Sequence, residues 1–333
     1  MMKWAKLAFI LAVLAIIALV IIAACKGGQV TADADSARAK ALAGDIERLR
    51  PLHTKLGKPH PRDWLAGPGR DEPGQTFDQY LACRPVRPVG KRTVLYIQPL
   101  GQFTPTQRRI IDLTADYMGR YFNTPVKVLR DVPASVIPQR ARRTHPTWGD
   151  KQVLTTWVLD ELLNPKLPAD AAACIAFTAA DLWPGEGWNF VFGQASLTDR
   201  VGVWSIYRNG DPDGGEAAFR LCLLRTLKTA THETGHMFSM QHCTAHECNM
   251  CGSNHREESD RRPLWCCPEC AAKTCWATRT DMLPRYLKLL AFARANALAA
   301  EAEFFAKSIK ALGGTVPPTT QPQHPKEPES SRR

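Results

Sequence analysis

Two histidines and a glutamate in one short stretch of this chain have the spacing of a metal site. His232 and His236 are four residues apart, so on an α-helix their imidazoles lie on one face, one turn apart. His242 comes six residues later and reaches the same point only if the chain leaves the helix near Ser239. Three imidazoles and one water molecule would complete a zinc tetrahedron. Glu233, beside the first histidine, is placed to take the proton of that water.

This pattern is more specific than a chance pair of histidines on a helix. Such a pair is more often structural than metal-bound, and HExxH alone occurs by chance roughly once per hundred chains of this length. A third histidine at one required position lowers that chance by about tenfold. Several cysteines follow at once, the first of them directly after His242. The stretch therefore predicts a zinc site.

The wider pattern resembles the archaemetzincins, a family of metzincin-type zinc peptidases. The resemblance covers roughly residues 94–275 and is carried by one run of residues, His232-Glu233-x-x-His236-x-x-Ser239-x-x-His242-Cys243-x4-Cys248-x-Met250, followed by Cys267-x-x-Cys270. It implies two zinc ions. The catalytic ion would be bound by His232, His236 and His242, with Glu233 as general base. The structural ion would be bound by Cys243, Cys248, Cys267 and Cys270, and Met250 would be the Met-turn methionine under the catalytic metal.

Two features depart from the family pattern. Ser239 stands where the family usually has glycine, and the gap between Met250 and the last cysteine pair is slightly short. Glycine tolerates a positive φ, whereas serine in the left-handed region costs roughly 1 kcal/mol or more. We therefore expect either a strained bend at Ser239 or a different backbone route.

The expected function is zinc-dependent hydrolysis of peptide bonds in a peptide or protein substrate. Bound zinc lowers the pKa of its water to about 7, Glu233 takes the proton, and attack on the polarised carbonyl proceeds without a covalent intermediate. One alternative is a catalytically silent zinc-binding protein of the same fold, favoured by Ser239 and opposed by the intact Glu233. Another is a basic module that docks nucleic acid on its cysteine-rich segment, which the apolar leader opposes.

Alternating strand and helix signals predict the elements that position this site. They indicate an α/β (α+β) fold, and the expected strands are 94–100, 126–129, 173–178 and 201–207. The resemblance implies a metzincin-like mixed twisted sheet with an antiparallel edge strand. The expected helices are 104–122, 152–163, a long active-site helix over about 216–240, and another over about 280–312. Segment 190–195 is expected at an antiparallel sheet edge, where an extended peptide can pair. Residues 131–149 are expected to be a loop, and Asp181 is expected in a turn.

The organisation expected along the chain has five parts. They are a targeting segment 1–25, a tether and Pro/Gly-rich wrap 26–92, a catalytic domain 93–275 with a zinc knuckle at 243–275, a C-terminal helix 276–314, and a disordered tail 315–333. The knuckle and the helix after it form a C-terminal subdomain.

The first 25 residues predict attachment to a membrane. Lys3 and Lys6 precede a continuous apolar run over residues 7–24, and Ile22-Ala23-Ala24-Cys25 resembles a bacterial lipobox with Cys25 as the lipidated residue. The run is also long enough to span a bilayer, so an uncleaved N-terminal anchor is the competing interpretation. Either one predicts an exported, membrane-anchored protein, whose thiolates would be protected by tight zinc binding.

The net charge limits which other partners are expected, and several cysteines have no assigned role. The formal net charge is +11, which suits anionic surfaces, although a basic soluble enzyme is the simpler interpretation. No run of Arg and Lys is interleaved with aromatics, so no nucleic acid partner is expected. Cys251, Cys266 and Cys275 lie near the knuckle and are either alternative ligands or disulfide partners.

Overall fold

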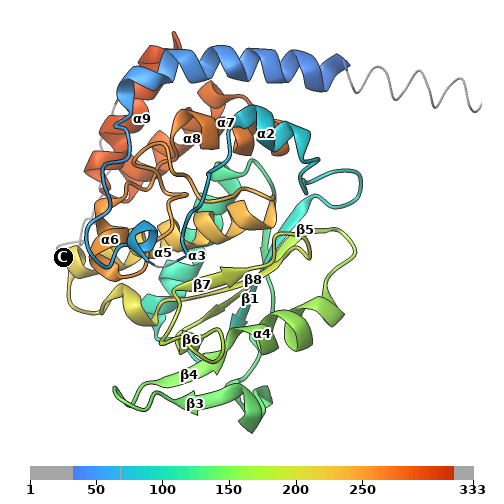
Figure 1. Cartoon of the computed structure of the whole chain (residues 1–333), viewed down its shortest axis with the longest axis vertical. Helices are drawn as coiled ribbons and strands as arrows, with labels where there is room; N and C mark the ends of the chain where they lie inside the picture. Colours follow the sequence, from blue (N-terminus) through green and yellow to red (C-terminus); the bar gives the residue numbers. More distant parts are fainter. Residues whose placement is uncertain (1–32, 68, 319–333) are drawn as a thin grey trace, which may run out of the picture.

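Five strands form the central sheet of the protein, in a computed structural model that describes residues 33–67 and 69–318 (Figure 1). Their order is β2-β1-β5-β8-β7, and their bounds are β1 Val94–Leu100, β2 Val126–Val128, β5 Ala171–Thr178, β7 Gly193–Ala195 and β8 Val201–Ser205. All pairs are parallel except β7 with β8, which places an antiparallel strand at one edge. The expected mixed α/β fold with an antiparallel edge strand is confirmed.

Alternate side chains of the strands enter two different cores. Leu95 and Ile97 of β1 pack on the side of α3 (Pro105–Tyr121) and α5 (Glu216–Met237). Val94 and Tyr96 pack on the other side, against α4 (Thr155–Trp157) and the π-helical turn η5 (Val158–Leu163). This period of two is what a pleated strand requires, and β5 is buried along its whole length because both faces are covered.

A second, three-stranded sheet corrects two expectations. Its order is β3-β4-β6, with bounds β3 Arg142–Thr144, β4 Lys151–Leu154 and β6 Asp181–Trp183. The predicted loop over residues 131–149 is wrong where β3 forms. The helix predicted to begin at residue 152 is wrong where β4 forms. Residues 151–154 pair in parallel with β6, so helical structure begins only at Thr155. The short turns η3 Ala134–Val136, η4 Gln139–Ala141, η6 Asn164–Lys166 and η7 Tyr207–Asn209 connect these elements.

The C-terminal part contains two helices where one was expected. After α6 (Arg256–Arg261) and α7 (Pro268–Ala277) come α8 (Met282–Ala295) and α9 (Ala299–Ala311). Ala297 between them has a φ of 52°, and the N–H of Leu298 donates to the carbonyl of Ala293 at 2.9 Å, which is a Schellman-type helix end. The chain folds back here because this lets Phe305 of α9 pack against Tyr286 of α8.

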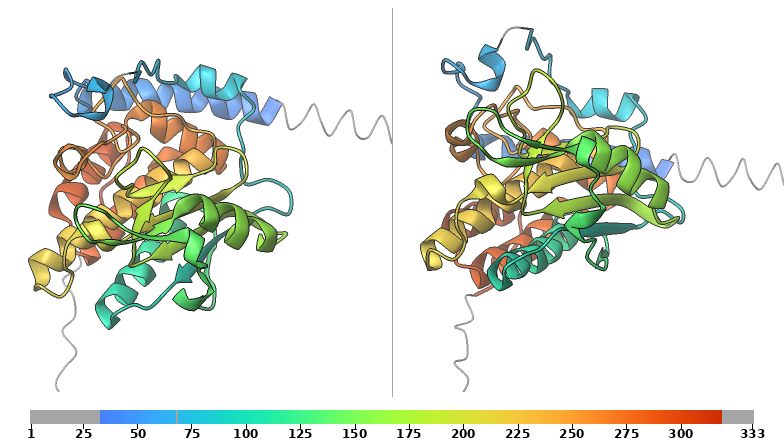
Figure 2. Two further views of the ribbon diagram at one scale, coloured as in Figure 1. Left: turned by 60° about the horizontal axis from the view of Figure 1, so that its bottom comes forward. Right: turned by 90° about the horizontal axis from the view of Figure 1, so that it is seen from below.

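The N-terminal part is a packed helix followed by a wrapping segment. Residues 33–49 are helical, and Leu42, Ile46 and Leu49 reach the main core. Figures 1 and 2 show this helix against the C-terminal helices, where Arg38 donates to the carbonyl of Thr280. It is thus a peripheral helix rather than a free tether. The segment that follows contains η1 (Arg50–Leu52), η2 (Trp64–Ala66) and α2 (Phe77–Ala82).

The expected targeting segment 1–25, with Cys25, lies outside the described residues, as does most of the expected tail. Within the described ranges, every helix is too short or too polar to cross a membrane.

Candidate active site

The three histidines expected to bind a metal meet at one point. His232 and His236 come from the last two turns of α5, and His242 follows the end of that helix. One ring nitrogen from each lies within 4.8 Å of the other two. The Nε2 atoms of His232 and His236 are 3.0 Å apart. The convergence inferred from their spacing is present, while their role as ligands stays a prediction.

A serine in the left-handed conformation turns the chain back after α5. Ser239 has a φ of 62°, and the N–H groups of Ser239 and Met240 donate to carbonyls of the last helical turn at 2.8 and 3.1 Å. This is the Schellman pattern, in which glycine is usual. The Ser239 hydroxyl accepts from the Val86 N–H at 3.1 Å and donates to the Leu197 carbonyl at 3.2 Å. Of the two expected alternatives, the strained bend is the one that the structure has.

Each of the three imidazoles is held through its Nδ1 atom. The acceptors are the carbonyl of Asn249 for His232 at 2.8 Å, the carbonyl of Met240 for His236 at 2.7 Å, and the carboxylate of Glu72 for His242 at 2.9 Å. Because these oxygens only accept, each Nδ1 carries a proton, and Nε2 is the nitrogen of each ring that can bind a metal. Burial lowers the pKa of His232 to about 3 and that of His236 well below its usual value, so both rings are neutral.

This donor set fits a zinc ion. Two unprotonated Nε2 atoms at 3.0 Å have no proton to share, so their lone pairs repel unless a cation lies between them. Zinc takes imidazole nitrogens at about 2.0–2.1 Å in a tetrahedral arrangement, which sets neighbouring nitrogens roughly 3.3 Å apart. The neutral, preoriented rings therefore match what this metal requires.

Glu233 lies between α5 and the edge strand β7. Its carboxylate is almost fully buried, and burial raises its pKa to about 8. A Cβ built on Gly193 of β7 would lie 2.8 Å from the Glu233 Oε1. The backbone of the edge strand therefore lies so close to this carboxylate that only glycine fits at position 193 without a shift.

A cleft with a volume of about 470 Å³ opens in front of these residues. One wall is α5 with His232, Glu233 and His236, and the other is β7 with the loop before it. Of the expected edge segment 190–195, only Gly193–Ala195 is a strand, and Val191 makes a single bridge to Leu182. All three residues of β7 line the cleft.

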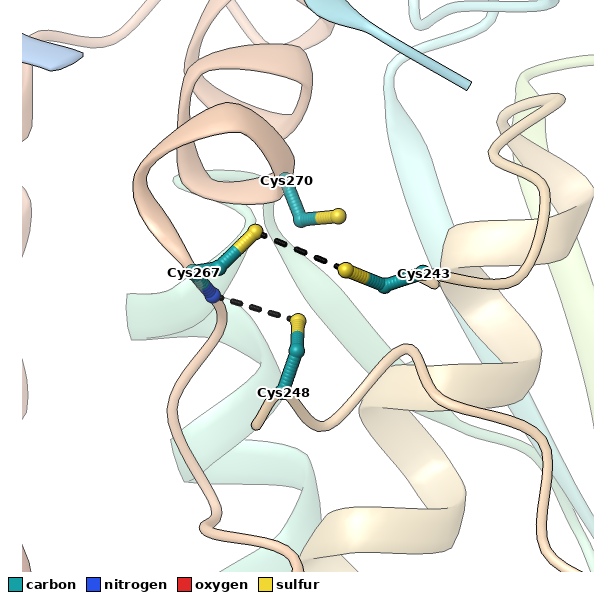
Figure 3. Close-up of side chains that lie close together, drawn as sticks. All are labelled: Cys243, Cys248, Cys267 and Cys270. Atoms are coloured by element: carbon teal, nitrogen blue, oxygen red, sulfur yellow. Dashed lines mark hydrogen bonds between the residues drawn. The ribbon is translucent and has the colours of Figure 1, made fainter. Parts of the chain in front are cut away.

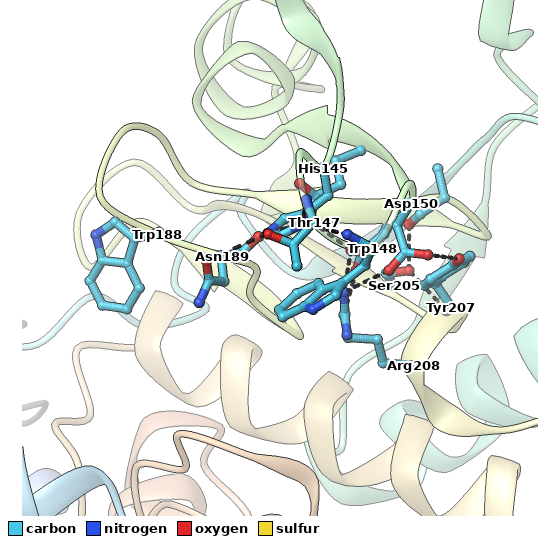
Figure 4. Close-up of polar contacts among 12 residues, drawn as sticks. His145, Thr147, Trp148, Asp150, Trp188, Asn189, Ser205, Tyr207 and Arg208 are labelled. Atoms are coloured by element: carbon cyan, nitrogen blue, oxygen red, sulfur yellow. Dashed lines mark hydrogen bonds and ion pairs between the residues drawn. The ribbon is translucent and has the colours of Figure 1, made fainter. Parts of the chain in front are cut away.

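An ion pair between Arg208 and the buried Asp181 helps to hold the loop that forms this wall. Figure 4 shows Arg208, Trp188 and Asn189 in the polar network of this region. Asp181, expected in a turn, is instead a fully buried residue of β6 whose carboxylate accepts two bonds from Arg208 at 2.8 and 2.7 Å. Gln152 donates to the same carboxylate at 2.7 Å and to the carbonyl of Asn189 at 2.9 Å. Arg143 donates to the carbonyls of Trp188 and Asn189, both at 2.9 Å. The position of the wall thus depends on the second sheet.

Four cysteines gather behind the histidines (Figure 3). The sulfurs of Cys243, Cys248, Cys267 and Cys270 all lie within 4.8 Å of one another, and all four residues are buried. The Cys267 N–H donates to the sulfur of Cys248 at 3.1 Å. The pKa of Cys243 lies far below its usual value, chiefly because the thiol of Cys248 donates to its sulfur. A cluster of four thiols that favours an anion suits a closed zinc site.

The remaining cysteines of this region stand outside the group of four. Cys251 donates to the carbonyl of His246 at 3.2 Å, and Cys266 lies 2.9 Å from the hydroxyl of Tyr121. Cys275 is fully buried. All ten described cysteines are free thiols, so the disulfide alternative for these three is wrong in this structure.

Met250 packs beneath the histidines. A Cβ built on Gly235, which lies between His232 and His236 on α5, would be 2.8 Å from the Met250 sulfur. The carbonyl of Met250 accepts from the N–H of Cys243 at 2.8 Å, which joins it to the four-cysteine cluster.

Sequence reasoning missed Glu72 as a partner of the third histidine. Glu72 lies in the wrapping segment, where it accepts from His242 and, at 2.9 Å, from the indole of Trp64. An acidic residue in a Pro/Gly-rich loop carries no periodic signal, so only the fold reveals it.

Three converging histidines, a buried glutamate on the same helix and an open cleft beside a sheet edge define a zinc metallopeptidase. The model of peptidase family M54 matches residues 166–275. Archaemetzincin-2 of Macaca fascicularis is 35% identical over a match of 264 residues, and the match covers 69% of this chain and 71% of the relative. Archaemetzincin-2 of Homo sapiens is 34% identical with the same coverage. The crystal structure of archaemetzincin from Archaeoglobus fulgidus is 28% identical, with a TM-score of 0.44, and covers 54% of this chain and 99% of that one. The chain belongs to the archaemetzincin family.

Proposed function

We propose that this protein hydrolyses peptide bonds at the His232, His236 and His242 centre, with Glu233 as general base. The observation that carries the proposal is that an acceptor holds the Nδ1 atom of each of the three rings, so that their Nε2 atoms are directed to one point. A zinc ion bound there supplies a Lewis acid that polarises a carbonyl and makes water more acidic. Everything else is done by residues of the chain.

Glu233 is the group that moves the proton. It lines the cleft beside His232 and His236, so its carboxylate is placed to take a proton from water and pass it to the leaving amine. The backbone of β7 orients the substrate. Because β7 pairs on one side with β8, an extended peptide can add on its other side through main-chain hydrogen bonds.

The four-cysteine cluster is proposed to hold a second, structural zinc ion. The cluster is buried and offers four sulfurs, which leaves no position for substrate. Cys243 follows His242 directly, so ordering this cluster also orders the third imidazole.

Attachment to a membrane through residues 1–25 is also a proposal. It rests on the apolar run before Cys25 and on the positive charge that precedes it. Fractionation of cells that express the full chain and a Cys25→Ser variant tests it. A lipoprotein would lose its lipid label in the variant, an uncleaved anchor would stay in the membrane fraction, and recovery of the wild type in the soluble fraction would contradict both.

Replacement of Glu233 by glutamine tests the peptidase assignment. The variant keeps the size of the side chain but removes the base, so it should retain both zinc ions and lose proteolysis of a peptide library by about 100-fold or more. Full activity in Glu233→Gln would overturn the proposed role. A zinc-loaded wild type that cuts no peptide would favour a catalytically silent protein of the same fold.

A further inference from the structure

Lys228 lies in the cleft one helical turn before His232, and its side chain is only 5% exposed. Its ammonium donates to the carbonyl of Ser259 at 2.8 Å. An ammonium has three donors, and within the described part of the chain no carboxylate pairs with this one. A buried charge without an ionic partner is costly, so it calls for an explanation.

The neighbouring cations are paired, which sets Lys228 apart. Arg262 pairs with Glu247 and, at 3.7 Å, with Glu258. Asp260 is the acidic residue nearest in sequence to Ser259, and its carboxylate accepts two hydrogen bonds from Arg225 at 3.0 and 2.6 Å. The fold thus pairs Arg262 and Asp260 with other residues. Glu301 of α9 is a further buried carboxylate that acts on Lys228, but among the described residues it forms no ion pair with the ammonium. Lys228 is one of the residues that line the cleft.

The lining of the cleft is biased toward positive charge. Arg70, Lys228 and Arg262 are the cations among the lining residues, and Glu233 is the single carboxylate there. Because Arg262 is paired with Glu247 and Glu258, the excess positive charge comes from Arg70 and Lys228. The guanidinium of Arg70 lies over the ring of Trp64, 3.6 Å from its centroid, and 5.2 Å from that of Trp188 at the rim. A concave site lined by one sign of charge concentrates ligands of the other sign.

We propose that Lys228 binds a carboxylate of the substrate, so that this site prefers peptides with an acidic side chain, or a free C-terminal carboxylate, close to the cleaved bond. This inference rests on the proposed peptidase function and names its substrate class. One helical turn is about 5.4 Å, and successive residues of an extended chain are about 3.3–3.6 Å apart. A carboxylate one or two residues from a bond held at His232 can therefore reach the ammonium of Lys228.

Pairs of peptides that differ only in Glu or Gln test the preference on the zinc-loaded full chain. The pair is moved through each position around the cleaved bond, and every peptide is made as a C-terminal acid and as an amide. We expect one position at which Glu raises kcat/KM by about 10- to 100-fold over Gln, the range for a hydrogen bond to a charged group. A Glu preference that survives amidation identifies a side chain as the source. A preference for the acid over the amide, with Glu and Gln equal, identifies the C-terminus.

Variants connect the preference to this lysine. Lys228→Met should bring the ratio of kcat/KM values to within about twofold of one, whereas Lys228→Arg should keep a ratio above one. Lys288→Met is the matched control, because it removes the same charge from α8, where the lysine donates to Asn123 outside the cleft. Equal cleavage of all pairs by the wild type, or an unchanged ratio in Lys228→Met, would overturn the inference.

Binding separates this inference from the proposed function. Calorimetry on the zinc-loaded Glu233→Gln variant measures the affinity for each peptide without turnover. The peptides are the Glu and Gln members of the pair that the wild type discriminates best. If the wild type cleaves no peptide, the pairs for every position are measured. If the variant binds the Glu peptide more tightly but the wild type cleaves no peptide, the peptidase assignment is contradicted and the carboxylate site is supported. Cleavage by the wild type with equal affinities for the Glu and Gln peptides would support the peptidase assignment and contradict the carboxylate site. If the peptides are neither bound nor cleaved, both proposals are contradicted.

Discussion

The carboxylate of Glu72 lies 2.9 Å from Nδ1 of His242, although 170 residues separate them in the sequence. Glu72 is itself oriented by the indole of Trp64, and the backbone N–H of Trp64 donates to Glu258 of α6 at 3.0 Å. The third imidazole therefore owes its orientation to a segment that precedes the expected catalytic domain. In metal sites, such partners of a ligating histidine fix the tautomer and raise the basicity of the ligand.

Glu72→Ala should weaken zinc binding at the three-histidine site by about 10- to 100-fold, because His242 loses the acceptor that fixes its ring. Competition with a chelator of known affinity measures the change. Asp71→Ala is the control, since this neighbouring carboxylate is exposed. Equal zinc affinity in Glu72→Ala and the wild type would show that the contact does not position the ligand.

Cys243→Ser should lower zinc occupancy at both sites, although Cys243 is not itself a predicted ligand of the catalytic zinc. Its sulfur lies 3.7 Å from that of Cys267, and its N–H donates to the carbonyl of Met250 beneath the histidines. Metal analysis and peptide cleavage on the purified chain measure the effect, with exposed Cys83→Ser as the control. Loss of one zinc ion with intact activity would mean that the two sites are independent.

Ser239→Gly should be more stable than Ser239→Ala by about 1 kcal/mol, because only glycine adopts the left-handed conformation without steric cost. Both variants lose the hydroxyl bonds to Val86 and Leu197, so the comparison isolates the backbone. Denaturant unfolding of the two zinc-loaded variants gives the difference. An alanine variant as stable as the glycine variant would contradict the strained bend.

The parts of this site that are local in sequence could be predicted. The spacing of His232 and His236 places them on one helical face whatever surrounds them, and the bend at Ser239 follows from where His242 must return. Glu72 and Lys228 could not be found this way. Glu72 matters because the fold places an imidazole from a distant segment beside it. Lys228 matters because, among the described residues, no carboxylate forms an ion pair with its buried ammonium.

The distinction between local and long-range signals also explains the errors in the predicted fold. The nearly continuous apolar runs of β1 and β5 predict strands correctly because both strands are long and buried. Strand β4 is short, and its extended conformation depends on pairing with β6. The break near Ala297 lies in an Ala-rich run with good helix propensity, and tertiary packing of Phe305 on Tyr286 overrides that propensity.

Gly193→Ala should lower kcat/KM by about 100-fold, because displacing a catalytic group by roughly 1 Å has an effect of that size. The new Cβ would lie 2.8 Å from both Cγ and Oε1 of Glu233, so either β7 or the carboxylate must move. Zinc content should not change. Gly44→Ala is the control, since a Cβ there meets nothing within 4 Å. Wild-type activity in Gly193→Ala would show that Glu233 tolerates displacement.

The preference for acidic peptides should depend on pH through Lys228. Burial lowers the pKa of Lys228 to about 8, Asp260 and Glu301 oppose this shift, and Arg225 and Arg256 add to it. The ammonium is therefore charged below pH 8 and becomes neutral as the pH rises through that value, whereas an exposed lysine stays charged to about pH 10.4.

The ratio of kcat/KM for the Glu and Gln peptides should accordingly be high at pH 6–7 and fall toward one above about pH 8. The quantity kcat/KM reports the pKa of the free enzyme, so the carboxylate that binds does not shift this midpoint. Taking the ratio removes the titration of Glu233, which affects both peptides alike. Lys228→Met should give a flat profile. A wild-type ratio that stays constant to pH 9.5 would mean that a cation other than Lys228, such as Arg70, carries the preference.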